Sequence, residues 1–381
     1  MESPAPIPVS DMVRRFIVEN RPVRGHFVRL EEAWRALREH QNYPAAVREL
    51  LGQAVSASVL LAATLKFRGT LTLQLHGNGA ARLLVAQCTH DFRVRALVRI
   101  NDERLAREAP DVATAAALTP EIFRSLVGES GRLVVTIEAA ERDARYQGIV
   151  PLAGASFAEC LEAYFASSEQ LPTRVRLAAD EKHAAGLLIQ KLPSERGTPR
   201  SPSAPRSPQA PLGRAASDAL GSADRPHAAD AQEAPDAQEA LDAQEAADAP
   251  DALRAQTAWL DAQHGIGRME RSELLAAPVE GVLRRNFSRS DVRLFAGAPV
   301  RFECRCDPRR VASILRALGA EEVREVLKEQ GSVTVTCDFC NRPYRFDAVD
   351  VEQLFASGGL ASGEFSADGP SNTRGPRDSL H

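Results

Sequence analysis

The sequence predicts an α+β N-terminal domain, a helical connector and a small C-terminal module that carries most of the cysteines. Three observations support this prediction. Strand-like alternation and helix-like periodicity are interspersed along the chain as far as Pro193. The composition then changes abruptly after Gly197, and four of the six cysteines fall between Cys304 and Cys340. We therefore expect two ordered units joined by a less regular stretch.

The overall composition limits the class of protein. With 381 residues, of which 44% are hydrophobic, the chain is long enough for two or three domains with real cores. Its net charge of -4 does not favour a general nucleic-acid binder. No apolar run reaches about 18 residues and no signal-peptide pattern opens the chain, so neither a membrane span nor export is expected. Paired thiols in such a chain fit the reducing cytoplasm, where cysteines bind metal or sense oxidants.

Strand and helix patterns fill the N-terminal domain, which we assign to residues 1–196. A long helix that begins at Pro44 carries small residues, which predict close packing against another element. Gly77 and Gly79 indicate a hairpin turn rather than a dinucleotide-binding loop, because no helix pattern follows them. Two strands are expected over 12–30, others over 71–75, 83–85, 94–100, 133–137, 175–177 and 187–189 and after 146–148, and further helices over 30–40 and 157–167.

The other cysteines and the histidines of this domain form no recognisable site. Cys88 and Cys160 lie far apart in the sequence, so we interpret them as small apolar packing residues. The histidines occur singly and lack the spacing of metal ligands. No nucleophile elbow, phosphate-binding loop or paired-carboxylate motif stands out, so the domain offers no candidate catalytic residue.

Residues 197–252 form an insertion rich in proline, alanine and acidic residues. Proline recurs at every third position from Pro199 to Pro211, which favours an extended polyproline conformation. The acidic hexad repeat that begins at Asp230 cannot bury enough apolar surface to offset the entropy lost on ordering, so we expect it to be disordered or transiently helical. An insertion tolerated between domains is better supported than a binding arm.

A helical linker is predicted over residues 253–297, beginning near Trp259. Four arginines lie along it, and they are not interleaved with aromatic residues as in a platform that stacks RNA bases. We therefore favour a solvated face over an RNA contact. The four are Arg284, Arg285, Arg289 and Arg293.

The last ordered unit covers residues 298–357, and residues 358–381 are expected to be a disordered tail. A strand through Val300 and Phe302 is expected to deliver the first cysteine pair, and Asn341 is expected to adopt the left-handed conformation after the second. Two helices follow the first pair, and a last helix ends the unit. The residues expected on their apolar faces are Val311, Ile314, Leu315, Leu318, Val323, Val326, Leu327, Val351, Leu354 and Phe355.

Cys304, Cys306, Cys337 and Cys340 form a CxC…CxxC pattern whose spacing suits one tetrahedral metal ion held by four thiolates. Zinc is the expected metal, because it is soft enough for thiolates and accepts tetrahedral geometry. Four protein ligands leave no open position, so a hydrolytic zinc centre is not predicted. Structural zinc contributes about 10–16 kcal/mol in zinc-finger peptides, so removing the metal should unfold this small module. The zinc-binding module is then either a structural ribbon or, because each close pair can form a disulfide, a switch.

Other short motifs accompany the cysteines. They are Val23-Arg24-Gly25, Tyr43-Pro44, Tyr146-Gln147-Gly148, Ser168-Glu169-Gln170-Leu171-Pro172-Thr173, Ala185-Gly186-Leu187-Leu188-Ile189-Gln190 and Tyr344-Arg345-Phe346. In this order they closely resemble the redox-regulated bacterial chaperone family called the 33-kDa heat-shock protein, over nearly the whole chain except about 197–252 and the tail. The insertion departs from the family pattern, and Asn341 stands where glycine is usual.

The resemblance implies a cytoplasmic holdase chaperone and not an enzyme. In the family the reduced form, with one zinc ion bound, is inactive, and oxidants such as hypochlorite oxidise the thiolates. Carried over here, Cys304–Cys306 and Cys337–Cys340 would become disulfides, zinc would leave, and the module and linker would unfold. Apolar surface would then bind unfolding client proteins during stress and prevent their aggregation, often as a homodimer of the oxidised form.

Two other classes of function remain open at this stage. A thiol–disulfide oxidoreductase would use the CxxC pair, although Cys337 does not open a helix as in a thioredoxin-like unit. A constitutive zinc-ribbon RNA binder would use the arginines of the linker, and its RNA binding would be salt-sensitive and indifferent to oxidation.

Overall fold

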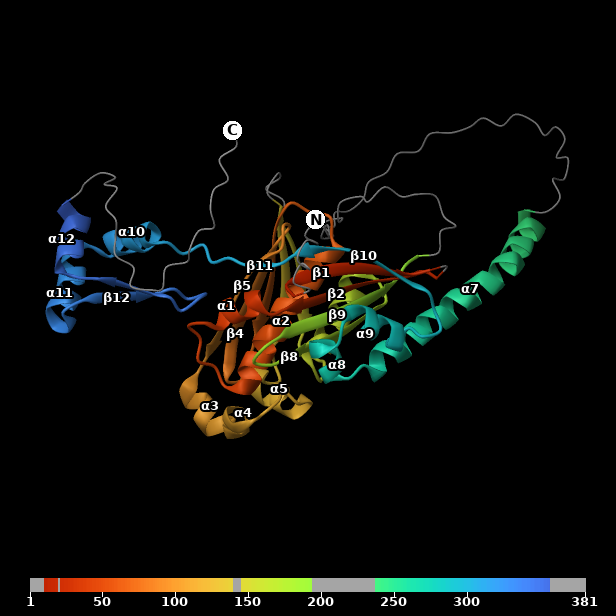
Figure 1. The fold of residues 1–381 in the computed structure, drawn as a ribbon, viewed down its shortest axis with the longest axis horizontal. Helices are drawn as coiled ribbons and strands as arrows, with labels where there is room; N and C mark the ends of the chain where they lie inside the picture. The colour runs from red at the N-terminus through yellow and green to blue at the C-terminus, as the bar shows by residue number, and fades with distance from the viewer. Residues whose placement is uncertain (1–9, 20, 140–144, 194–236, 357–381) are drawn as a thin grey trace, which may run out of the picture.

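The computed structural model describes residues 10–19, 21–139, 145–193 and 237–356. The fold is a mixed α/β arrangement of two large sheets with helices around them and a smaller C-terminal unit. The predicted polyproline stretch, the first part of the acidic repeat and the predicted tail lie outside the described residues. Figure 1 shows the C-terminal unit, in blue, at one end of the molecule and the teal helices that precede it toward the other.

The first large sheet has five strands, and each neighbouring pair is antiparallel. The strands predicted over 12–30 and near residues 175 and 187 are confirmed as members of this sheet. In spatial order the strands are β10 (Val292–Pro299), β1 (Met12–Val18), β2 (Val23–Leu30), β9 (Ala184–Lys191) and β8 (Thr173–Ala179).

The second large sheet has six strands, of which the first pair is parallel and the others are antiparallel. The turn at Gly77 leads directly into another strand, so the hairpin interpretation is confirmed. In spatial order the strands are β11 (Arg301–Phe302), β5 (Arg93–Ile100), β4 (Ala81–Thr89), β3 (Gly69–His76), β6 (Arg132–Ala139) and β7 (Arg145–Pro151).

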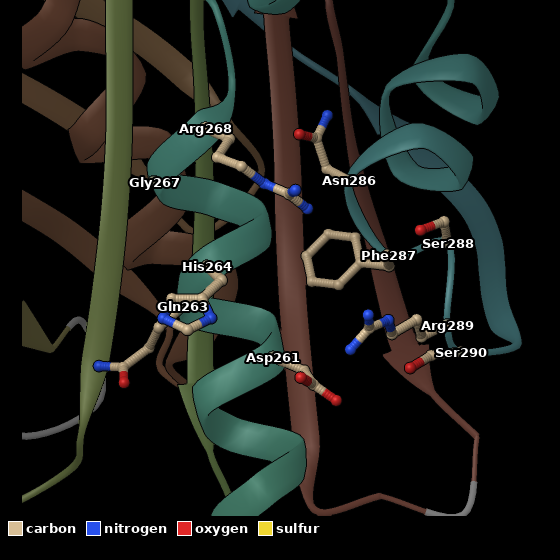
Figure 2. Close-up of a pocket in the computed structure, with 10 residues that line it drawn as sticks. All are labelled: Asp261, Gln263, His264, Gly267, Arg268, Asn286, Phe287, Ser288, Arg289 and Ser290. Atoms are coloured by element: carbon tan, nitrogen blue, oxygen red, sulfur yellow. The ribbon is translucent and has the colours of Figure 1, made fainter.

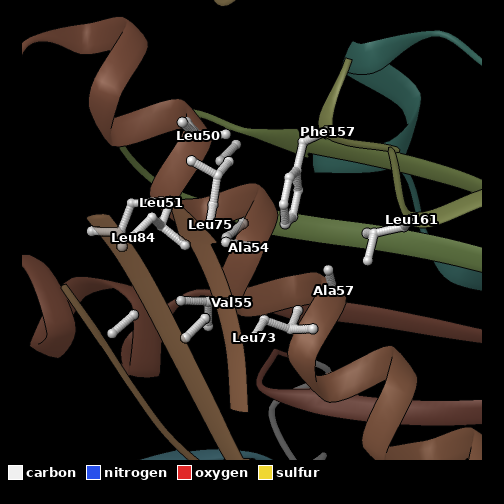
Figure 3. Close-up of a cluster of buried hydrophobic side chains, with 14 of the residues drawn as sticks. Leu50, Leu51, Ala54, Val55, Ala57, Leu73, Leu75, Leu84, Phe157 and Leu161 are labelled. Atoms are coloured by element: carbon white, nitrogen blue, oxygen red, sulfur yellow. The ribbon is translucent and has the colours of Figure 1, made fainter. Parts of the chain in front are cut away.

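Helix α2 (Ala45–Thr64) packs against strands of both large sheets and is the centre of the main core. Its small residues Ala54, Ser56 and Ala57 are fully buried, which confirms the predicted close packing. Figure 3 shows Leu50 and Leu51 of this helix among side chains from β3, β4 and the helix that begins at Phe157. By length and composition α2 could cross a membrane, but 89% of its apolar 18-residue stretch is buried inside the protein, as in the core helix of a soluble protein.

Shorter helices complete the N-terminal region (residues 10–193), and three of them, α3 to α5, were not predicted. Their capping signals were present: Asn101 accepts a hydrogen bond from the Arg104 amide, and Thr119 accepts one from the Ile122 amide ahead of Pro120. The helix predicted over 157–167 ends earlier and continues as a π-helical turn. The elements are α1 (Glu32–Arg38), α3 (Asp102–Glu108), α4 (Pro110–Thr114), α5 (Pro120–Val127), α6 (Phe157–Tyr164) and η1 (Phe165–Glu169).

Three helices cover the first sheet on the face opposite to α2, and we call residues 253–291 the linker. The linker side chains and the outward side chains of β1, β2 and β9 form a second apolar cluster, separate from the core around α2. With α2 on one face and the linker on the other, β9 is buried along almost its whole length. The helices are α7 (Ala237–Arg268), α8 (Arg271–Ala276) and α9 (Val279–Asn286).

Residues 237–252 of the insertion, expected to be disordered or transiently helical, belong to α7, because alanine, glutamate and glutamine have high helix propensity. One prediction for this region needs correction. Residues 292–297, assigned to the helical linker, lie in strand β10 at the edge of the first sheet. β10 could form because β1 offers it a free edge, and an edge of that kind has no signal in the local sequence.

The four-cysteine module (residues 303–356) has its own small core, and the predicted helix–helix–strand–strand–helix order is confirmed. Asp307 caps the first helix through the Arg310 amide, and Gly331 ends the second in the left-handed conformation. The elements are α10 (Pro308–Leu318), α11 (Ala320–Gln330), β12 (Val333–Thr336), β13 (Pro343–Phe346) and α12 (Ala348–Ala356).

The apolar faces predicted for α10 and α11 are too wide. Ile314 and Leu318 are more than half exposed, and Val326 is 36% exposed. Helix α10 contributes a narrow buried stripe of Val311, Ala312 and Leu315 to the core, and so small a module cannot cover the rest of the face. The strand predicted through Val300 also differs, because β11 pairs with β5 of the N-terminal region and not within the module.

Alanine substitutions at two helical glycines, Gly52 and Gly281, distinguish the effect of packing on stability from the effect of helix propensity. A Cβ on Gly52 would lie 2.4 Å from the Ala179 Cβ, whereas a Cβ on Gly281 would meet nothing within 4 Å. We expect Gly52→Ala to lower the free energy of unfolding by about 1–3 kcal/mol through overpacking. Gly281→Ala should raise it by about 0.5–1 kcal/mol, because alanine loses less backbone entropy than glycine. Urea denaturation of the reduced protein measures both, and equal stability of the two variants would contradict this packing.

Candidate metal centre

The first cysteine pair follows directly after β11, the edge strand of the second large sheet. Arg301 and Phe302 pair with β5, and the Glu303 amide then donates to the Val94 carbonyl at 3.0 Å. The Glu303 carboxylate accepts two hydrogen bonds from Arg93, at 2.7 and 2.9 Å. Cys304 follows immediately, so the N-terminal region fixes the point at which the first pair begins.

The second pair sits in the turn between β12 and β13. The Cys337 amide donates to the Arg342 carbonyl at 3.0 Å, and the Asn341 amide donates to the Cys337 carbonyl at 2.8 Å. Asn341 has a φ of 53°, so the predicted left-handed conformation is confirmed. These bonds close the turn and hold Cys337 and Cys340 on the same side of the hairpin as the first pair.

The four cysteine sulfurs form one compact cluster. All four Sγ atoms lie within 4.8 Å of one another, with Cys304 3.7 Å from Cys337 and Cys306 3.4 Å from Cys340. A tetrahedral ion with metal–sulfur bonds of about 2.3 Å requires sulfurs about 3.8 Å apart. Cys340 is buried and the other three are partly buried. The residues present could therefore hold one metal ion with four sulfur ligands.

The pKa values of the cysteine thiols also favour a bound cation. A hydrogen bond with Cys340 lowers the pKa of Cys304 to about 5 and raises the pKa of the Cys340 thiol. Burial raises the pKa of Cys306 to about 11. Without a cation the Cys304 thiolate is thus stabilised by its hydrogen bonds, whereas ionisation of Cys306 and Cys340 is disfavoured. A cation among the sulfurs would remove the repulsion that otherwise prevents several of them from ionising.

The second cysteine turn also contacts the N-terminal region. Gln41 donates from Nε2 to the Phe339 carbonyl at 3.0 Å, and the Arg95 guanidinium lies 4.1 Å from the centre of the Phe339 ring. Arg99 forms an ion pair with Asp338 at 2.8 Å. Sequence reasoning missed these contacts, because more than 200 residues separate the partners and nothing in their spacing marks them.

The other candidates from the sequence do not join this cluster. Cys88 and Cys160 are fully buried in the main core, and burial raises the pKa of both thiols, which confirms the packing interpretation. Cys337 lies in a turn and not at the start of a helix, so the setting of a thioredoxin-like active site is absent. All four arginines that the sequence assigned to the linker are exposed, although Arg293 lies in β10. Of these, Arg285 and Arg293 form ion pairs with Glu273 and Glu19.

Comparison with known proteins places this chain in a family. The sequence profile of the family described as Hsp33 protein matches residues 11–347. The 33 kDa chaperonin of Nitrosococcus oceani is 36% identical over 345 residues, which are 91% of this chain and 94% of that protein. The 33 kDa chaperonin of Pseudomonas aeruginosa is 36% identical over 366 residues, 96% of this chain and 99% of the relative.

A solved structure supports the fold. The crystal structure of the 33 kDa chaperonin from Thermotoga maritima, described as a heat shock protein 33 homologue, superposes with a TM-score of 0.59. It is 21% identical to this chain and covers 91% of it, and the match spans 98% of the solved chain. The resemblance inferred from short motifs is therefore confirmed by profile, sequence and fold, and the protein belongs to the Hsp33 family of chaperones.

Proposed function

We propose that the protein is a redox-regulated, cytoplasmic holdase and not an enzyme. In this proposal the reduced, zinc-bound form is inactive, and the oxidised form binds unfolding proteins and prevents their aggregation. The observation that carries the proposal is the cluster of four sulfurs within 4.8 Å of one another, joined through β11 and β10 to a linker that covers apolar surface. The relatives bear the name chaperonin, which supports the binding of unfolded clients.

Cys304, Cys306, Cys337 and Cys340 would hold one zinc ion. When bound, zinc supplies the positive charge that keeps the four sulfurs deprotonated and cross-links the two halves of the module. The core of the module is small, since only nine of its side chains form the buried cluster. Its folding therefore depends on its ligand sulfurs remaining reduced.

Oxidation removes those ligands. Two thiols and one hypochlorite yield one disulfide, chloride and water, so two electrons pass from each cysteine pair to the oxidant. We propose disulfides between Cys304 and Cys306 and between Cys337 and Cys340. Pairing within each motif is favoured once the module loosens, because closing a short loop costs less entropy than closing one of about 30 residues. Reductant and renewed metal binding would reverse the change.

The linker covers the apolar surface that we propose for client binding. On the sheet side the surface includes Phe16 and Phe27, which are almost completely buried. The linker residues packed on it are Trp259, Ala262, Ile266, Met269, Leu274, Leu275, Val279, Val282, Leu283 and Phe287. Removing the linker would expose both sets of side chains, and unfolding proteins offer the same kind of apolar surface. We propose that the oxidised form also pairs through this surface as a homodimer.

Polar contacts hold the linker closed in the reduced form. Arg29 of β2 donates to the Leu274 and Ala277 carbonyls at the end of α8, at 2.8 and 2.6 Å. Arg271 of α8 lies 3.2 Å from the buried Glu49 carboxylate of α2, whose pKa is raised by burial. Detaching α8 would leave that carboxylate without its cation, so the linker should stay in place while the module is folded.

The first experiment treats the reduced protein with hypochlorite. We expect zinc release, followed with a chromogenic chelator, to rise together with suppression of aggregation of a heat-denatured client. Reductant plus zinc should reverse both. Zinc that stays bound, or that leaves without any gain of activity, would reduce the four cysteines to a structural site.

A second experiment compares two cysteine substitutions. Cys304→Ala removes one proposed ligand and should lower zinc content and disturb regulation by oxidant. Cys160→Ala, in the core of the N-terminal region, should retain one zinc per chain and normal activation. Atomic absorption and the holdase assay provide the two readouts. Full zinc and normal activation in Cys304→Ala would show that the proposed site is wrong.

The two tryptophans report on the linker. Trp259 belongs to the linker and packs against the first sheet. Trp34 lies in the main core and donates from Nε1 to the Asp180 carbonyl at 2.9 Å. In Trp34→Phe, oxidation should shift the emission of Trp259 to the red as its ring meets water. In Trp259→Phe, the emission of Trp34 should change little. If Trp34 responds as strongly as Trp259, the N-terminal region itself unfolds and the linker is not the moving part.

A further inference from the structure

A cleft lies between the last turns of α7 and the segment that joins α9 to β10. Its volume is about 580 Å³, and Figure 2 shows the side chains that line it. Phe287 and Asn286 form its inner wall and are almost completely buried. Asn286 already donates to Glu273 at 3.1 Å and to the Val282 carbonyl at 2.9 Å, so it is held in place by the protein itself.

The cleft gathers cationic and hydroxyl groups without matching acids. Arg268 comes from α7 and Arg289 from the opposite wall, and Figure 2 shows both side chains reaching into the space beside the Phe287 ring. Within the described part of the chain, neither guanidinium has a hydrogen-bond or ion-pair partner. The other polar groups of this lining are His264, Gln263, Ser288, Ser290 and Asp261.

The one carboxylate in the lining is already engaged. Asp261 lies 3.4 Å from Nη1 of Arg21, which comes from the turn between β1 and β2. Its charge is therefore compensated from outside the cleft, and the two unpaired guanidiniums leave an excess of positive charge. Guanidinium groups and hydroxyls are the donors that bind phosphate oxygens in proteins.

We propose that this cleft binds an oligophosphate anion, either free or as the phosphate chain of a nucleotide. Arg268 and Arg289 would bind phosphate oxygens from the two walls, and Ser288 and Ser290 would add hydroxyl donors. A single phosphate would fill little of about 580 Å³, whereas a chain of several phosphates reaches both arginines at once.

Because the cleft lies within the linker, a bound anion would affect release of the linker. This step rests on the proposed function. Arg268 ends α7 and Arg289 follows α9, so an anion between them ties α7 to the C-terminal end of the linker. A ligand that binds only the closed linker stabilises that form by mass action. The anion would therefore delay release of the linker after oxidation.

The binding test uses the reduced, zinc-loaded full-length protein and isothermal titration calorimetry. Tripolyphosphate and ATP should bind without added magnesium, and rising salt should weaken both. Similar affinities would identify the free phosphate chain as sufficient, and much tighter binding of ATP would identify a nucleotide. Binding of adenosine alone, or of neither anion, would overturn the proposal. Zinc content after dialysis checks that the anions have not removed the metal.

Two double variants with equal loss of charge locate the site. Arg268→Gln with Arg289→Gln should weaken binding of tripolyphosphate at least about tenfold, because two charge-assisted hydrogen bonds are lost. Arg284→Gln with Arg309→Gln removes two exposed arginines outside the cleft and should bind as the parent does. If the two double variants bind tripolyphosphate with equal affinity, the anion does not bind in this cleft. Circular dichroism and zinc content establish that both variants are folded.

A separate measurement tests the regulatory step. The lag between hypochlorite addition and holdase activity should lengthen with tripolyphosphate in the parent protein. It should not lengthen in the double variant Arg268→Gln with Arg289→Gln. If tripolyphosphate binds normally but leaves the lag unchanged, the anion does not delay release of the linker, although the anion site itself is supported. Absence of holdase activity even without the anion would instead count against the proposed function.

Discussion

The apolar contact between the linker helices and the outer face of the first sheet is the constraint on which the rest of this structure depends. β9 is buried almost throughout, which is possible only with α2 on one face and the linker on the other. A two-sided sheet of this kind exposes a large apolar face whenever one cover leaves. In the proposed function, this contact stabilises the reduced form, and its release supplies the client-binding surface of the oxidised form.

The chain after the linker joins this cover to the sulfur cluster. β10 extends the first sheet and β11 extends the second, and Cys304 follows two residues later. The second cysteine turn is held from the other side by Gln41 and Arg95. A change at the cysteines thus acts on a segment bonded to both sheets. That segment is also close to the linker along the chain, since β10 begins six residues after α9 ends.

Polar groups at the linker contact complement the apolar ones. Arg29 donates hydrogen bonds to carbonyls at the C-terminal end of α8. Arg271 balances the charge of the buried Glu49 carboxylate in the N-terminal region. Such groups add little when both partners are in water, but they oppose partial detachment, because one partner would remain buried and unpaired. They make the closed linker a defined state, and the cationic cleft beside α9 adds a place where a small anion could act on it.

The sequence by itself determined the features that depend on local chemistry. Four thiols in two close pairs specified a sulfur cluster that could hold a metal ion, and Asp307 and Gly331 marked helix ends. Alternating residues marked the strand near Leu73, and a short apolar run marked the strand at Leu187. Only the tertiary structure decided that residues 292–297 form a strand, because the free edge of β1 lies far away in the sequence. It also decided that Ile314 stays exposed and that Arg95 reaches Phe339. Periodicity shows which residues share a face, whereas the neighbour that covers that face is set by long-range packing.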